Sequence, residues 1–193
     1  MLPGELNVHI RGIAPTIMHN GQTADPANEF AQAMKELTSK RSKSKADFAE
    51  ISRIEFLASL YLDESGHPAW PGENIEAMIR AAARKQSKGK DVESSLFSNG
   101  YWPLIYDGPK SPEKLYADKR FVKACLAVNP GAKTRIMRTR AMFPVWELKF
   151  TVNYDTDVID AEQVTQWLAF AGQKIGLSDW RPRFGRFEVL AIN

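Results

Sequence analysis

The last part of the sequence places three arginines and three aromatic residues in a stretch punctuated by glycines. It reads GLSDWRPRFGRFEV and contains Gly176 and Gly185. Glycine adopts backbone angles that other residues avoid, and it leaves amide groups accessible to an anion such as phosphate. Arginines can neutralise phosphates, and an exposed ring can stack on a base. The candidate binding residues here are Trp180, Arg181, Arg183, Phe184 and Arg186.

The same stretch also has a purely structural interpretation. It would then be a packed turn before a last strand, with Asp179 paired to an arginine and Trp180 filling the core. In either case we expect Trp180 to be more buried than the arginines, because a tryptophan ring gains more from burial than a guanidinium group does.

A second basic run, KTRIMRTR, contributes Lys133, Arg135, Arg138 and Arg140 within eight residues and with no acid among them. If the run is extended, Arg138 and Arg140 share one face and Met137 points to the other. A helix would instead spread the charges around its axis. Because no acidic residue is close in sequence, the pattern favours contact with nucleic acid over a salt-bridged surface.

Two further basic segments, SKRSKSK and ARKQSKGK, are typical of loops rather than of helices or strands. They add affinity for a polyanion but little geometry, and their alternative role is that of a solvated tether. The candidates in these segments are Arg41, Lys43, Lys88 and Lys90.

The residues that could carry catalysis are few. Of the three histidines, His19 in MHNG is best placed to act as a general base, as a metal-independent ribonuclease would need. We find no phosphate-binding loop, nucleophile motif or paired metal-binding histidines. Asp155, Asp157 and Asp160 are better interpreted as charge before a helix, with Asp160 as its N-cap. We therefore expect no enzyme activity, no metal and no cofactor.

Composition indicates an ordinary globular protein with an uneven charge distribution. The chain has 193 residues and a formal net charge of +3, yet the segment from Arg80 to Lys149 holds 15 Lys and Arg against 6 Asp and Glu. This asymmetry predicts one electropositive face. The single Cys125 excludes an internal disulfide and favours a reducing cytoplasmic location. The sequence shows neither an apolar run long enough to cross a membrane nor a signal peptide, so we expect no membrane partner.

The pattern of apolar residues predicts an α+β protein with one domain spanning residues 1–193. Alternation predicts strands at 5–13, 121–129, 145–155 and 186–193, and helical spacing predicts helices at 72–85 and 160–176. Residues 28–62 also have helical spacing, which the lysine- and serine-rich stretch 38–46 divides into two helices. We therefore expect a helical, basic insertion at about 22–62 and a flexible loop at about 86–95. The order of elements is that of a split β-α-β layout on an antiparallel sheet.

Three segments in the same order resemble the repeat-associated (RAMP) superfamily, whose members build CRISPR effector complexes. WPGENIEAMIRAAAR is similar to that superfamily's P-G-S-S-L-K-G-x-x-R segment, although Glu73 and Ala77 depart from the usual Ser and Gly. The final glycine-rich stretch resembles the loop between its last helix and last strand. VHIRGIAPTIMHNG is similar to the start of the subunits that line guide RNA. The chain also resembles a family of phage and prophage proteins with P-x-x-M-H-N-G, P-G-E-N-I-E-A-M-I and D-W-R-P-R-F-G-R-F.

The resemblance implies a modified ferredoxin-like (RRM-like) β-α-β-β-α-β fold that holds single-stranded nucleic acid, RNA or DNA, as one unit of a side-by-side homo-oligomer. A phage origin would place the protein in the cytoplasm of a bacterial host. One rival is a phage protein that mimics a CRISPR backbone subunit and binds host or phage proteins. Another is a metal-independent endoribonuclease that uses His19.

Overall fold

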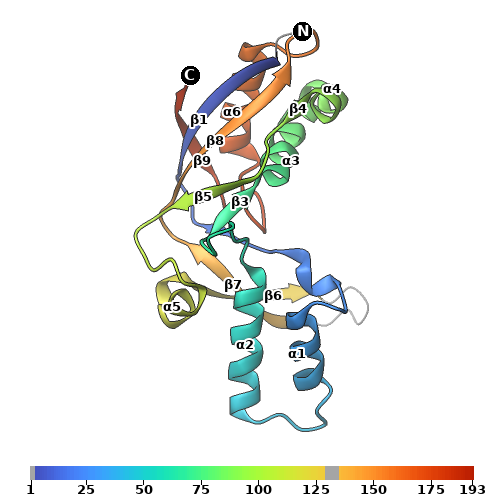
Figure 1. Cartoon of the computed structure of the whole chain (residues 1–193), viewed down its shortest axis with the longest axis vertical. Coiled ribbons are helices and arrows are strands. Elements are labelled where there is room, and N and C mark those ends of the chain that lie inside the picture. The colour runs from blue at the N-terminus through green and yellow to red at the C-terminus, as the bar shows by residue number, and fades with distance from the viewer. Residues whose placement is uncertain (1–2, 129–134) are drawn as a thin grey trace.

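The computed structural model describes residues 3–128 and 135–193, and it has two regions along its long axis (Figure 1). The first region is an antiparallel sheet in the order β3-β5-β8-β1-β9, with β4 also paired to β8. Its strands are β1 (Pro3–Gly12), β3 (Ala69–Pro71), β4 (Leu96–Phe97), β5 (Tyr101–Ile105), β8 (Glu147–Asp155) and β9 (Phe187–Ile192).

Two helices cover one face of this sheet and complete the predicted fold. They are α3 (Gly72–Ala83), between β1 and β5, and α6 (Ala161–Lys174), between β8 and β9. The sequence order β1-α3-β5-β8-α6-β9, with β1 between β8 and β9, is the ferredoxin-like β-α-β-β-α-β arrangement. The α+β prediction is therefore confirmed.

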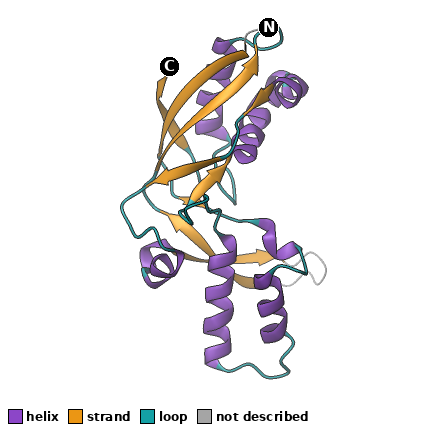
Figure 2. Cartoon of the chain, in the orientation of Figure 1, coloured by secondary structure: helices purple, strands orange, loops and turns teal. Residues whose placement is uncertain are grey.

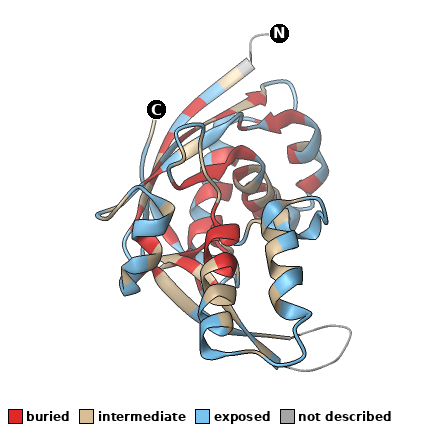
Figure 3. Ribbon diagram, turned by 60° about the horizontal axis from the view of Figure 1, so that its bottom comes forward, coloured by how far each residue is buried: buried red, intermediate tan, exposed pale blue. Residues whose placement is uncertain are grey.

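Alternation along the strands decides which face of the sheet carries the core. Leu148, Phe150 and Val152 of β8 are at most 2% exposed, whereas Lys149 between them is exposed. Trp167 of α6 is also buried against this face. Figure 3 shows the buried residues concentrated in the sheet and the helices next to it. Burial of this apolar face is the main force that holds strands and helices together.

The second region is built from segments inserted into the ferredoxin-like order (Figure 2). One insertion contains β2 (Thr16–Ile17), the 3-10 turn η1 (Gly21–Ala24), α1 (Glu29–Thr38) and α2 (Lys45–Ser59). The other contains α5 (Pro112–Ala117), the 3-10 turn η3 (Lys119–Phe121), β6 (Val122–Val128) and β7 (Arg135–Phe143). These strands form a separate sheet in the order β2-β7-β6.

The predicted division of residues 28–62 into two helices is confirmed. The side chain of Asn28 accepts the backbone N–H of Phe30 at the start of α1. Ser44 and Asp47 form a reciprocal capping box at the start of α2. The two helices therefore lie within the expected insertion, while the assignment of all 193 residues to one domain stays a prediction.

The loop predicted at about 86–95 is wrong. Residues Arg84–Gln86 form the 3-10 turn η2, and Gly89–Ser95 form the helix α4. Val92 is 1% exposed and belongs to the core, so this polar segment folds because a neighbouring surface buries its one large apolar residue. In the part of the chain that the structure describes, no helix combines the length and apolar character needed to cross a membrane.

Candidate nucleic-acid interface

The two glycines of the C-terminal stretch stand where a side chain would be strained. Gly176 has φ +85° and Gly185 has φ +76°. A Cβ at Gly185 would lie 2.3 Å from the carbonyl oxygen of Leu177, which in turn accepts the hydroxyl of Thr16 at 2.6 Å. The glycines therefore allow the loop of residues 176–186, the C-terminal loop, to fold back on itself.

Backbone hydrogen bonds attach the C-terminal loop to the segment that follows β1. The N–H of Asp179 donates to the carbonyl of Ile17 at 2.8 Å, and the N–H of Gly185 donates to the carbonyl of Pro15 at 2.7 Å. Because Ile17 also pairs with β7 through β2, the loop and β7 are held in one fixed arrangement.

The two aromatic rings of the C-terminal loop, Trp180 and Phe184, differ in exposure. Trp180 is 49% exposed and has φ +56°, a left-handed conformation that turns its side chain outward, whereas Phe184 is only 9% exposed beneath it. The two ring centroids are 5.6 Å apart, and the guanidinium carbon of Arg183 lies 5.8 Å from the Trp180 ring. Trp180 therefore does not fill the core, as the purely structural interpretation would have it, and base stacking by Trp180 or Phe184 stays a prediction.

The arginines of the C-terminal loop are exposed, as expected. Arg181 and Arg183 both follow Trp180 in the sequence and are exposed, and Arg186 is exposed at the end of the loop. The carbonyl of Arg186 accepts the backbone N–H groups of Ile13 and Ala14, so its position is fixed by the backbone.

The second basic run forms strand β7. Arg138 and Arg140 have the same parity along the strand and share one face, as predicted for an extended chain, and Met137 is 59% exposed. Arg135 is exposed near the start of the strand. Lys133 lies outside the residues that the structure describes.

Strand pairing adds a cation that the sequence analysis missed. Lys123 of β6 stands directly opposite Arg140 of β7, and Cys125 stands opposite Arg138. Residues directly opposite each other in an antiparallel pair share a face, so Lys123 joins the basic side of this hairpin. Alternation within residues 121–129 could have marked Lys123 as a candidate, but its partner depends on a register that the sequence does not reveal.

Beyond the two residues of β7 that pair with β2, side chains of α2 accept hydrogen bonds from backbone N–H groups of β7. Glu55 Oε2 accepts the N–H of Thr139 at 2.8 Å, and Ser59 Oγ accepts the N–H of Ala141 at 2.9 Å. The hydroxyls of Ser52 and Thr139 also lie 2.9 Å apart. The three helical residues are spaced by three and four positions, so they occupy one face of α2.

Arg138 is engaged by a buried carboxylate. Its Nη1 donates to Glu55 Oε1 at 2.5 Å, and the side chain of Glu55 is 6% exposed against 36% for Arg138. A carboxylate this buried needs a paired charge and hydrogen bonds. Arg138 therefore neutralises Glu55 first, and only the remaining part of its guanidinium group faces outward.

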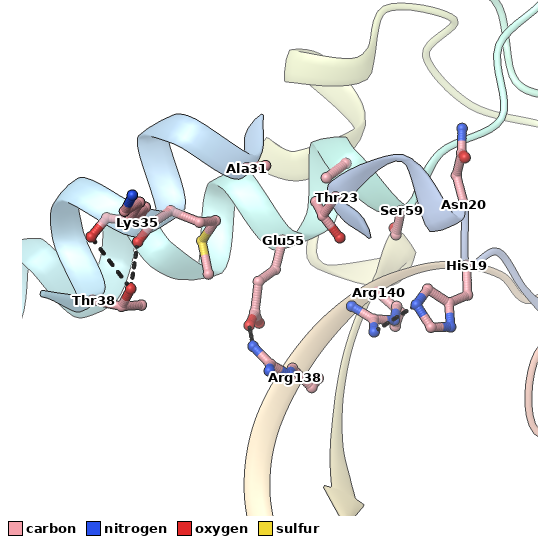
Figure 4. Close-up of a pocket in the computed structure, with 12 residues that line it drawn as sticks. His19, Asn20, Thr23, Ala31, Lys35, Thr38, Glu55, Ser59, Arg138 and Arg140 are labelled. Carbon is pink, nitrogen blue, oxygen red and sulfur yellow. Dashed lines mark hydrogen bonds and ion pairs between the residues drawn. The ribbon is translucent and has the colours of Figure 1, made fainter. Parts of the chain in front are cut away.

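His19 connects Arg140 to the C-terminal loop. Its Nε2 lies 3.1 Å from Nη2 of Arg140 (Figure 4). Its Nδ1 lies 3.4 Å from Oδ2 of Asp179. Since a guanidinium group can only donate, Nε2 is the acceptor and Nδ1 carries the proton that faces Asp179. The contact with His19, helped by the charge of Arg140, lowers the pKa of the Asp179 carboxyl despite its partial burial. Asp179 is therefore paired with a histidine and not with an arginine.

A cavity of about 550 Å³ opens beside these residues (Figure 4). It lies between α1, α2, β7 and the segment after β2. Its lining comprises His19, Asn20, Thr23, Ala31, Met34, Lys35, Thr38, Glu55, Ala58, Ser59, Arg138 and Arg140.

The remaining basic candidates lie away from His19 and Arg140. Arg41 and Lys43 are in the connection between α1 and α2, at the far end of the second region in Figure 1. Lys88 and Lys90 are at the start of α4, at the opposite end of the molecule, and Lys88 pairs with Asp91 at 2.8 Å.

The carboxylates before α6 have a structural role. Asp160 is the N-cap of α6 and forms a capping box with Gln163, as predicted. The backbone N–H of Asp157 donates to the side chain of Asp155 at 3.0 Å. Within residues 3–128 and 135–193, no group of three or more His, Cys, Asp or Glu residues is arranged to hold a metal ion.

Comparison with known proteins finds a similarity in fold but not in sequence. No family model matches the sequence, and no curated protein matches it significantly. A chain in a solved structure described as the type III-B Cmr-beta bound to cognate target RNA matches with a TM-score of 0.53 and 11% identity. The match covers 98% of this chain and 59% of that chain, so this chain spans about three fifths of its neighbour's length. At 11% identity this match shows a shared fold and no more, and nothing in these comparisons supports the phage family.

Proposed function

We propose that this protein binds single-stranded nucleic acid without cleaving it. The observation that carries the proposal is the contact chain Arg140–His19–Asp179, which joins the basic face of β7 to the C-terminal loop. Two basic segments that are far apart in sequence thereby form one surface, the β7–loop surface, which we define by Lys123, Arg138, Arg140, Trp180, Arg181 and Arg183. Arg135 is exposed but has the opposite parity along β7, so it lies outside this definition.

The chemistry of the β7–loop surface suits a flexible polyanion with exposed bases. Arginines contact phosphates at any sequence, and the exposed ring of Trp180 offers a stacking platform that accepts every base. The similarity in fold to a chain from a complex bound to target RNA supports a nucleic-acid ligand. RNA and DNA both present phosphates and base faces, so both belong to the proposal, together with side-by-side assembly, phage origin and a cytoplasmic location.

Ribonuclease activity is the second candidate, because His19 is exposed beside a carboxylate and a guanidinium group. A general base needs a free nitrogen within hydrogen-bond reach of the proton it removes. The Nε2 of His19 already accepts a hydrogen bond from Arg140, which favours a positioning role over catalysis. If His19 is catalytic, His19→Ala will abolish cleavage and leave binding intact.

Fluorescence anisotropy with labelled 30-residue single-stranded RNA, single-stranded DNA and duplex tests the proposal. We expect binding to single strands, no shortening of the label, and a log affinity that falls by about 0.7 per neutralised phosphate for each tenfold rise in salt. A flat salt response or no binding would overturn the proposal. If a protein partner is still captured after the arginines of the surface are replaced, the protein-mimic alternative takes precedence.

A further inference from the structure

The cavity beside Arg140 has an apolar side and a cationic side. Ala31 and Met34 of α1 and Ala58 of α2 supply apolar surface, while Lys35, Arg138 and Arg140 supply positive charge; the carboxylate of Glu55, also in the lining, is paired with Arg138. Its volume of about 550 Å³ lies within the roughly 300–1,000 Å³ typical of small-molecule sites. Its lining therefore suits a ligand that joins a flat, weakly polar group to an anion.

Most of the neutral polar groups in the cavity are already hydrogen-bonded within the protein. The hydroxyl of Thr38 donates to the carbonyl of Met34 at 2.8 Å, and that of Ser59 donates to the carbonyl of Phe56 at 2.7 Å. The amide of Asn20 donates to the carbonyl of Leu60 at 3.1 Å. Few of these groups are left to read the edge of a base, so a base would be held by shape and by stacking on guanidinium planes.

The charged groups at the mouth of the cavity are less fully used. The Nζ of Lys35 has no hydrogen-bond or ion-pair partner among the described residues, and this side chain is exposed. Arg140 is hydrogen-bonded to the neutral nitrogen of His19 and to the carbonyl of Thr139, but to no carboxylate among the described residues. These two cations therefore retain net charge for an incoming anion.

We infer that this cavity receives one unstacked nucleoside of the bound strand, with the adjoining phosphate at Arg140 and Lys35. The inference rests on the proposed function and adds a subsite to it: the β7–loop surface follows the strand, and the cavity takes a single base out of its stack. Because most of its neutral polar groups are hydrogen-bonded within the protein, the subsite has little means to distinguish one base from another.

A strand with bases and a fully abasic strand of the same length separate base contacts from phosphate contacts. We would measure the dissociation constants of both 30-residue probes in a Trp180→Ala background, so that stacking on Trp180 does not contribute. The test variant is Ala31→Phe, which puts a phenyl ring into the space proposed for the base without changing charge. The matched control is Ala33→Phe on the same helix, which faces a different cavity of about 830 Å³ whose charged residues are Glu29, Glu50, Arg53 and Glu113. Thermal unfolding of each variant checks that it is folded.

We expect the strand with bases to bind about tenfold more tightly than the abasic strand, which corresponds to about 1.4 kcal/mol. Ala31→Phe should bring this ratio close to one, and Ala33→Phe should leave it at about ten. An unchanged ratio in Ala31→Phe, or equal binding of the two probes before the cavity is filled, overturns the subsite but not the surface. If the unmodified protein binds neither probe, the proposed function fails, and this inference fails with it.

Discussion

The pair formed by Glu55 and Arg138 predicts that stability and nucleic-acid affinity change in opposite directions. Glu55→Gln keeps an oxygen that can accept the N–H of Thr139 but removes the charge that neutralises Arg138. Charge-assisted hydrogen bonds contribute about 1.5–3 kcal/mol, and because Arg138 is partly exposed we expect a loss of about 1–2 kcal/mol. For a chain of this size, that loss lowers the melting temperature by about 2–8 °C.

Glu55→Ala should cost more than Glu55→Gln, because it also removes the acceptor of the Thr139 N–H. Thr139 is 7% exposed, and a buried donor without a partner costs about 1–3 kcal/mol further. Urea unfolding at equilibrium measures both variants. Glu50→Gln is the control, since Glu50 is on the same helix and its pair with Arg53 is exposed, so we expect a change within about 0.5 kcal/mol.

Affinity supplies the second half of this prediction. Without the charge of Glu55, the guanidinium group of Arg138 can contact a phosphate, so Glu55→Gln should bind single strands more tightly. The slope of log affinity against log salt should steepen by about 0.7, as expected for one more phosphate contact. Weaker binding by Glu55→Gln, or stability unchanged in both Glu55 variants, would show that the pair does not hold Arg138 away from the ligand.

Four single residues carry the further predictions. Trp180→Ala should weaken single-strand binding by about 1–3 kcal/mol with no change in salt slope, whereas Arg140→Ala should reduce that slope by about 0.7; anisotropy at several salt concentrations separates them. Pairing with His19 lowers the pKa of the Asp179 carboxyl. The stabilisation from this pair is therefore present above the ordinary carboxyl pKa near 4 and is lost as pH falls through the lowered pKa. The difference in melting temperature between the unmodified protein and Asp179→Asn should accordingly close below about pH 4. Gly185→Ala should destabilise the fold by more than about 2 kcal/mol, because of its positive φ and the nearby carbonyl, while Gly66→Ala, at φ +74° with open space around it, should cost about 1 kcal/mol in the same unfolding assay.

Periodicity was sufficient to predict the elements with a strong apolar pattern. Strand β8 alternates along its whole length, and α3 and α6 each carry an apolar stripe, so the ferredoxin-like order could be predicted without coordinates. Helix α4 could not be predicted in this way, because it has a single large apolar residue, Val92, and the burial of that residue depends on neighbouring elements of the core.

The sequence indicated the basic residue types of the candidate site but not the side-chain contacts between them. Arg138 and Arg140 were correctly expected on one face of an extended strand, but the partner of Arg138 is 83 residues away and leaves no local signal. The exposure of Trp180 depends on a left-handed backbone angle, which is uncommon for a bulky residue and which composition does not reveal. His19 was singled out for catalysis, whereas its contacts make it the link between two basic segments.

The contacts of α2 with β7 have a consequence for how the smaller sheet could extend. An unpaired strand edge is a template for another strand, and proteins commonly protect it with a covering helix. Ser59 and Glu55 occupy the donors of Ala141 and Thr139, so an incoming strand cannot pair with this part of β7. Among the residues that the structure describes, β6 pairs only with β7, so the outer edge of β6 is a place where a further strand could pair with this sheet.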